Sequence, residues 1–274
     1  MMRACAKAVG TILVFVSANV SAYSVLNPKP DNELRDFSTD RPDTTEGPFT
    51  VDAGHVQLEW EIASYGTDRE NAERTNTLTS SINIKLGVSD NVDLQLILEP
   101  STHVETRSAA GTETASGMND TVVRAKFNLW GNDGGDTAFA LLPFVSFPTH
   151  DSAFGSDGKT EGGLILPLEF KLPGDWDAAT MLEFDGVRNR DNDGYVLELV
   201  ESISLSHTIV GDLGGFFELV NLRRNESGAK SEGYFDSGLM YTVGNNMQID
   251  AGFNFGITAA AEDARYFVGI SWRH

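Results

Sequence analysis

Cysteine, basic residues and long apolar runs are all scarce in this chain of 274 residues. The single cysteine, Cys5, excludes a disulfide-stabilised scaffold and argues against a thiolate zinc site. Twenty Lys and Arg residues stand against 40 Asp and Glu, so the chain lacks the basic face that a nucleic-acid partner requires. A run of about 18 apolar residues is also missing, which excludes helical membrane spans but leaves membrane-spanning strands open.

The remaining composition is that of a folded chain, with 41% apolar residues and 16 Phe. Residues 1–22 begin with Arg3 and Lys7, continue without charge through residues 8–16 and end on small residues at 20–22. This order predicts a secretory signal peptide, the alternative being a buried N-terminal helix. We therefore divide the chain into a signal peptide at 1–22, an N-terminal segment at 23–53 and a folded domain at 54–274.

Apolar and polar residues alternate with a period of two through most of residues 54–274. Val56, Leu58, Trp60 and Ile62, for example, alternate with polar neighbours, an arrangement that puts one set of side chains on each face of a strand. No stretch shows a sustained helical period. The alternation predicts about twelve strands, near residues 54–65, 75–88, 92–102, 120–131, 137–149, 162–171, 176–186, 194–208, 214–223, 233–243, 247–257 and 265–273.

The connections between these strands alternate between short and long. Short turns are expected at 89–91, 131–136, 172–175, 209–213 and 244–246, and longer polar loops at 66–74, 103–119, 150–161, 187–193, 224–232 and 258–264. This rhythm and the even strand number predict an antiparallel, up-and-down transmembrane β-barrel, with short turns on the periplasmic side. A soluble, secreted β-sandwich is the alternative all-β fold.

The aromatic residues fall at the two ends of the expected strands. Trp130, Trp176 and Trp272 lie at the periplasmic ends, and Tyr65, Tyr195, Tyr234 and Tyr266 lie at the opposite ends. Such rings form the interfacial girdles of membrane barrels. By strict alternation, Trp130 and Tyr234 are expected to point inward.

Residues 36–51 read DFSTDRPDTTEGPFTV and are followed by DAGHVQLE at 52–59. This stretch resembles the opening motif of an outer-membrane β-barrel family associated with transport in the phenol meta-cleavage degradation pathway. VVRAKFNLWG at 122–131, PFVSFPT at 143–149 and EGGLILPLEF at 161–170 resemble that family too, although His150 stands where a Gly is expected. The resemblance implies a location in the outer membrane.

The N-terminal segment carries the first group of candidate site residues: Arg41 among Asp40, Asp43 and Glu46. One hypothesis is a plug folded into the lumen, with Arg41 paired to barrel carboxylates and helping to gate the pore. The other is a periplasmic tail held near the wall by a turn at 41–43.

Strand alternation adds a second group of candidates, the charged residues expected to face the lumen. They hold the barrel's shape by pairing across the wall, or set a field that selects solutes. The candidate pore-lining residues are Glu59, Glu61, Lys85, Asp93, Arg124, Lys126, Glu183 and Asp250, and the other expected inward charges are Glu99, Glu169, Lys171, Glu198, Asp236 and Arg265.

These observations favour a non-enzymatic outer-membrane channel for passive uptake of small solutes, aromatic or hydrophobic ones among them. The expected partners are outer-membrane lipid and lipopolysaccharide, the solute, and the barrel-assembly machinery, whose signal the alternating Tyr266–Trp272 stretch resembles. The alternatives are a structural or adhesive barrel, and a lipid esterase built on His150-Asp151-Ser152. No cofactor or metal site is predicted, since the five His are scattered and the acidic loop 191–194 lacks the distal Glu of a calcium site.

Overall fold

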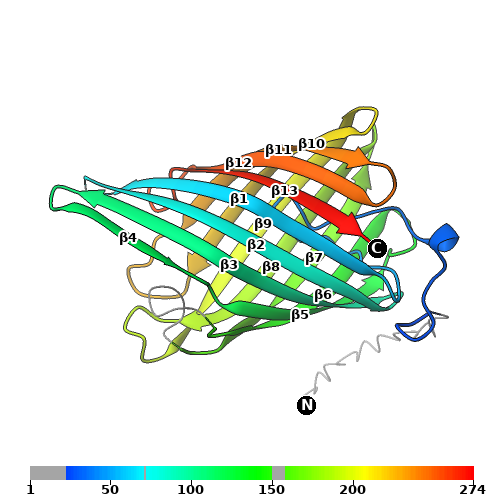
Figure 1. The fold of residues 1–274 in the computed structure, drawn as a ribbon, viewed down its shortest axis with the longest axis horizontal. Coiled ribbons are helices and arrows are strands. Elements are labelled where there is room, and N and C mark those ends of the chain that lie inside the picture. Colours follow the sequence, from blue (N-terminus) through cyan, green and yellow to red (C-terminus); the bar gives the residue numbers. More distant parts are fainter. Residues whose placement is uncertain (1–22, 71, 150–157) are drawn as a thin grey trace, which may run out of the picture.

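The structure is a computed structural model that describes residues 23–70, 72–149 and 158–274 (Figure 1). The expected signal peptide at 1–22 and the His150-Asp151-Ser152 triplet lie outside the described residues. Within the described part, no helix is both long and apolar enough to cross a membrane.

The described chain is almost entirely β-structure, preceded by one short 3-10 helix, η1 (Asp31–Glu33). The strands are β1 (Val56–Glu70), β2 (Glu73–Ser89), β3 (Val92–Ser108), β4 (Gly111–Gly117), β5 (Thr121–Trp130), β6 (Thr137–Phe147), β7 (Glu161–Leu172), β8 (Trp176–Arg188), β9 (Tyr195–Val210), β10 (Leu213–Arg224), β11 (Glu232–Val243), β12 (Met247–Gly256) and β13 (Ala264–Arg273).

Twelve of these strands close into one antiparallel barrel. Each pairs with its neighbours in sequence, β3 pairs with β5, and β13 returns to β1 with Leu58 opposite Trp272. Closure leaves no strand edge in the wall, so the backbone N–H and C=O groups are paired as a lipid environment demands. The expected all-β, twelve-stranded up-and-down barrel is confirmed, in place of the sandwich. Most strand ends lie within two residues of their expected positions.

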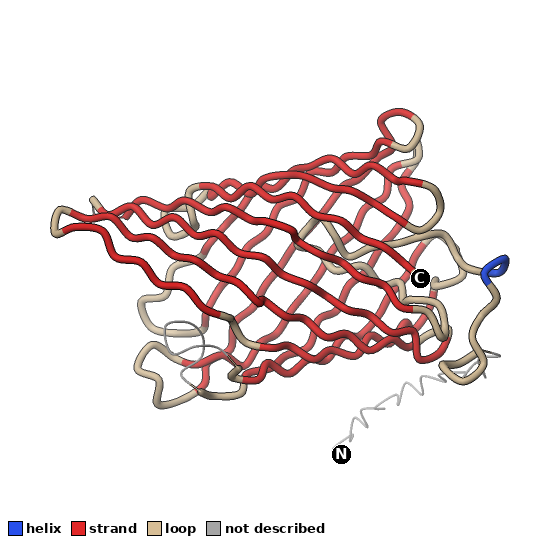
Figure 2. Tube along the Cα trace, viewed as in Figure 1, coloured by secondary structure: helices blue, strands red, loops and turns tan. Residues whose placement is uncertain are grey.

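Two of the expected long loops are wrong. β1 and β2 continue into residues 66–74 and leave only a tight turn, while residues 103–119 hold the outer part of β3 and the additional strand β4. Figure 2 shows these hairpins projecting past the other strands at the left. Their residues are polar on both faces, because they leave the apolar layer, and so they lack the alternation that reveals a strand.

The outer surface of the barrel is apolar. Residues such as Leu94, Leu182 and Leu219, which would be buried in a soluble protein, are 42–51% exposed. Trp176 and Trp272 are exposed at the end with the short turns, and Tyr195 and Tyr266 at the other end. An apolar band between aromatic girdles is the surface that a bilayer covers, so the barrel is a transmembrane one.

The expected inward orientation of Trp130 is wrong. A shift in the β5–β6 register between Asn128 and Trp130 turns this ring outward, where it is 49% exposed. It packs 5.0 Å from the ring of Phe139 and joins the Trp girdle. Tyr234, by contrast, packs inside the barrel against Val220 and its neighbours, as alternation predicts.

The lipid-facing band generates a stability prediction. Leu219 lies near the middle of β10 and is 51% exposed. Leu219→Arg should lower the free energy of unfolding in lipid vesicles by about 2–4 kcal/mol, because the charge would lie near the bilayer midplane. Val210→Arg, beside a short turn, should cost about 0–1 kcal/mol. Denaturant titration followed by tryptophan fluorescence measures both, and equal losses would contradict the assigned membrane position.

Candidate functional site

The N-terminal segment enters the barrel at the end that carries the short turns and the C-terminus (Figure 1). We call residues 35–53 the lumen segment. Its hydrogen bonds and ion pairs reach wall residues from Gln57 on β1 to Asp250 on β12. The inward-facing side chains of a twelve-stranded barrel leave space between them, and this segment occupies that space.

Asp52 anchors the segment at the mouth of the barrel. Its carboxylate, 1% exposed, accepts a hydrogen bond from Arg35 Nε at 2.7 Å and ion pairs from Lys29 and Arg273 at 3.1 Å each. Burial opposes ionisation, but Arg35 and Lys29 hold the pKa of Asp52 below its usual range. This cluster could not be predicted from sequence, because Arg273 lies at the far end of the chain and no local pattern links it to Asp52.

Asp40 forms the ionic centre of the lumen. Its carboxylate oxygens accept from Lys126 Nζ at 2.7 and 2.9 Å and pair with Lys85, which also pairs with Glu59. Burial alone would raise the pKa of Asp40, but the two ammonium groups hold it well below its usual range. Asp40 also accepts from the backbone N–H of Gly47 at 3.0 Å, which folds the segment back on itself.

Arg41 links β1 and β12, the two wall strands on either side of β13. Its guanidinium lies 2.7 Å from Asp250 on β12 and 3.3 Å from Glu61 on β1. The group also stacks over the Phe267 ring, with 5.7 Å between Cζ and the centroid. A Cβ at position 269 would lie 2.4 Å from the guanidinium, so Gly269 makes room for it.

The tip of the segment, residues 42–46, reaches the opposite side of the barrel. The backbone N–H groups of Thr44 and Thr45 each donate to Glu218 on β10 at 2.8 Å. The Thr45 hydroxyl meets Ser202 on β9 at 2.6 Å, and Glu46 pairs with Arg124 on β5. Alternation could have identified Glu218, which stands between the outward-facing Phe217 and Leu219, but the surrounding residues look apolar on both faces.

Asp43 stands apart from the other acidic residues of the segment. Burial and the nearby charge of Glu218 raise the pKa of the Asp43 carboxyl well above its usual range. Asp43 therefore lies beside a like charge, whereas Asp40 and Arg41 are each matched by opposite ones.

The remaining candidates lie on the inner wall. Asp93 is 0% exposed and accepts from the Val51 backbone N–H at 3.1 Å. Glu183 lies on β8, in register with Val200 on β9 and two residues beyond Met181. Among the other expected inward charges, Glu198 pairs with Arg224, Arg265 with Glu262, and Asp236 accepts from the Thr44 hydroxyl at 3.4 Å.

One patch of the inner wall is apolar. We call this patch the apolar wall. Its members point inward from β6 to β10 and pack against one another, with Phe144, Leu222 and Tyr234 around them. The Glu46 backbone N–H lies 3.4 Å from one of them, Met181 Sδ, so the tip contacts its edge. The apolar wall comprises Ala140, Leu142, Ile165, Met181, Val200 and Val220.

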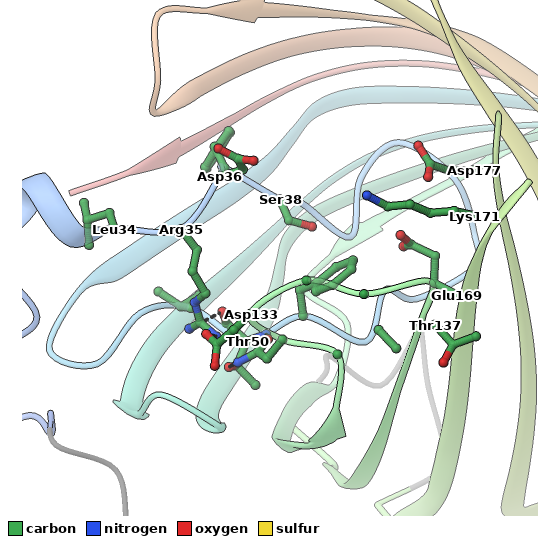
Figure 3. A pocket seen from close by; sticks show the side chains of 18 of the residues that line it. Leu34, Arg35, Asp36, Ser38, Thr50, Asp133, Thr137, Glu169, Lys171 and Asp177 are labelled. Atoms are coloured by element: carbon green, nitrogen blue, oxygen red, sulfur yellow. Dashed lines mark hydrogen bonds and ion pairs between the residues drawn. The ribbon is translucent and has the colours of Figure 1, made fainter. Parts of the chain in front are cut away.

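A cavity of about 740 Å³ lies between the lumen segment and the short-turn ends of β6, β7 and β8. Figure 3 shows Arg35, Asp36 and Ser38 of the segment on one side, with Glu169, Lys171 and Asp177 of β7 and β8 on the other. Along β6, the inward residues lead from Ala138 in the cavity lining to Ala140 and Leu142 in the apolar wall. The cavity and the wall are therefore continuous along the same strands.

A family model described as "Putative MetA-pathway of phenol degradation" matches residues 39–274. A search of curated proteins finds no match.

Several solved structures match this chain at low sequence identity. The COG4313 outer membrane channel from Pseudomonas putida F1 is 11% identical, with a TM-score of 0.65 over 86% of this chain and 100% of that one. The β domain of the Bordetella autotransporter BrkA is 14% identical, covering 80% and 98% of the two chains at a TM-score of 0.48. The NalP translocator domain from Neisseria meningitidis is 12% identical, covering 80% and 88% at 0.46. At such identity the first match supports the barrel fold and nothing further.

The raised pKa of Asp43 generates a pH prediction. Because the pKa is higher with the segment docked than in free chain, protonated Asp43 favours docking and ionised Asp43 opposes it as pH rises. Asp43→Asn should therefore slow hydrogen exchange of residues 39–47 several-fold at pH 8, with little effect below the ordinary Asp pKa. Exchange measured by mass spectrometry tests this. The exposed Asp36→Asn is the control, and equal slowing in both variants would contradict the assignment.

Proposed function

Since this chain belongs to the MetA-pathway family of phenol degradation, we propose that it is an outer-membrane channel for passive uptake of small apolar solutes, aromatic ones among them. The lumen segment closes the path, and displacement of its tip opens it. The observation that carries this proposal is the apolar wall, which continues into the cavity along β6 and β7.

An apolar inner wall is unusual for a pore that conducts hydrophilic solutes, because such barrels have polar interiors. Leu142 and Ile165 lie inside the barrel and are 0% and 2% exposed. In a soluble protein such residues would form the core, but in this barrel the lipid-facing surface is apolar as well. Their position supports a stretch of the path, next to the charged lining of the cavity, along which an apolar solute contacts apolar side chains.

The charge distribution supports the same path. Arg41 and Asp40 hold the segment against β1, β2, β5 and β12 through ion pairs. Between the segment and strands β6 and β7, by contrast, the cavity remains unfilled. A solute that follows the apolar wall therefore passes the tip of the segment, where only the Glu46–Arg124 ion pair must break.

Planar-bilayer recording tests the channel directly. The protein lacking residues 23–53 should give discrete conductance steps larger than those of the protein that retains the segment, because the truncation removes the material that fills the lumen. Circular dichroism of the refolded proteins is the control for an intact barrel. Silence in both proteins, with intact β-structure, would contradict the channel and favour a structural or adhesive barrel.

A charge on the apolar wall tests the solute class. Val200→Asp should reduce initial uptake of radiolabelled toluene by cells producing the protein about tenfold or more, since even about 1.4 kcal/mol of added barrier is a factor of ten. Gln95→Glu adds the same charge on the polar side of the lumen and should leave toluene uptake nearly unchanged. Equal effects of the two substitutions would contradict a path along the apolar wall.

A further inference from the structure

The hairpins that project past the rim carry a row of arginines. We call residues 65–70, 73–80, 101–108 and 111–117, contributed by β1 to β4, the outer blade (Figure 2). The strand register places Arg69 opposite Arg74, and Arg74 opposite Arg107. All three are exposed side chains on one face of three neighbouring strands.

Like charges directly opposite each other destabilise a sheet. The row is only partly compensated by its neighbours: Arg107 lies 2.8 Å from Glu105, and Arg74 Nε donates to Asn76 Oδ1 at 3.1 Å. In a chain with a net charge of −20, three adjacent guanidinium groups indicate a local requirement for anion binding.

The two faces of the outer blade differ in charge. The arginine face continues the lipid-facing side of the barrel, because Tyr65, Leu78 and His103 stand in register on that side. The opposite face, above the lumen, carries only acidic residues among its charged positions. They are Asp68, Glu70, Glu73 and Glu113. The basic residues therefore point toward the membrane surface and away from the pore.

The arginine face is hollowed. A depression of about 290 Å³ has Tyr65 and Leu78, 43% and 46% exposed, at its membrane end. Polar groups line its outer end, where Tyr65 Oη donates to Asn76 Oδ1 at 3.0 Å. Its lining is completed by Arg74, Asn76, His103, Glu105 and Arg107. The hollow thus passes from an apolar floor to a cationic rim.

The height of the row matches a headgroup layer. Tyr65 stands opposite Tyr266 in the outer aromatic girdle, which marks the edge of the hydrocarbon. Arg69 lies four residues farther along β1, a strand distance of about 13 Å, or about 10 Å above the girdle for a strand tilted by about 40°. Guanidinium groups at this level meet lipid phosphates, which they bind through paired hydrogen bonds.

We propose that the arginine face of the outer blade is a binding site for the phosphorylated glycolipid of the outer leaflet, lipopolysaccharide. The arginines hold the phosphates of its lipid A part, and the Tyr65–Leu78 floor contacts the first part of its acyl chains. The site rests on the outer-membrane location in the proposed function. It does not require that the barrel conduct any solute.

Native mass spectrometry of the purified protein in detergent micelles tests the site. Bisphosphorylated lipid A should form a retained adduct, and the double variant R74Q/R107Q should weaken that binding about tenfold, since two charged hydrogen-bonding groups are lost. The matched control is R190Q/R223Q, which removes two exposed arginines that are ion-paired to Glu226 and Glu201 elsewhere on the outer side. This control should bind lipid A like the unmodified protein.

Any one of several outcomes would overturn the proposal. They are equal binding by R74Q/R107Q and the unmodified protein, an equal loss in both double variants, and equal binding of dephosphorylated lipid A. Competition by inorganic phosphate at matched concentration would indicate a general anion site and would also overturn the lipid assignment. Bilayer conductance of R74Q/R107Q should stay unchanged, so failure of this site and failure of the channel are distinguishable.

Discussion

The structure depends on one constraint: in lipid, every backbone N–H and C=O group of the wall must find a partner inside the protein. The pairing of β13 with β1 meets it by closing the sheet. Closure with twelve strands also encloses a lumen wider than inward side chains fill. The charged residues that face this lumen, such as Lys126 and Asp250, are then removed from bulk water and need partners. The lumen segment supplies those partners.

The position of the segment follows from two adjacent residues of opposite charge. Asp40 is matched by Lys85 and Lys126, and Arg41 by Asp250 and Glu61, on different sectors of the wall. A shift of one residue would bring Arg41 toward the ammonium groups or, in the other direction, Asp40 toward the carboxylates. Buried pairs of this kind contribute little net stability, but they penalise the wrong arrangement strongly. The ion pairs therefore specify one docked position.

Much of the wall could be predicted from sequence, because alternation is a local property of a strand that leaves residues such as Glu59, Lys85 and Asp250 on its inner face. The prediction failed where alternation ends or shifts: in the polar hairpins at 66–74 and 103–119, and at the β5 irregularity that turns Trp130 outward. The apolar wall was missed because β6 is apolar on both faces. The Asp52–Arg273 pair joins residues 221 positions apart, which no local pattern indicates.

The same electrostatics divide the lumen segment into parts of unequal stability. Its stem, on either side of the tip, pairs opposite charges: Asp40 with two lysines, and Asp52 with Arg35, Lys29 and Arg273. Its tip brings Asp43 toward Glu218, where burial and repulsion oppose ionisation. Local openings of a protein begin where the free energy of opening is smallest. We therefore expect the tip to leave the apolar wall while the stem stays docked, so that the lumen opens on its apolar side with the ion pairs of Asp40, Arg41 and Asp52 intact and only the Glu46–Arg124 pair broken.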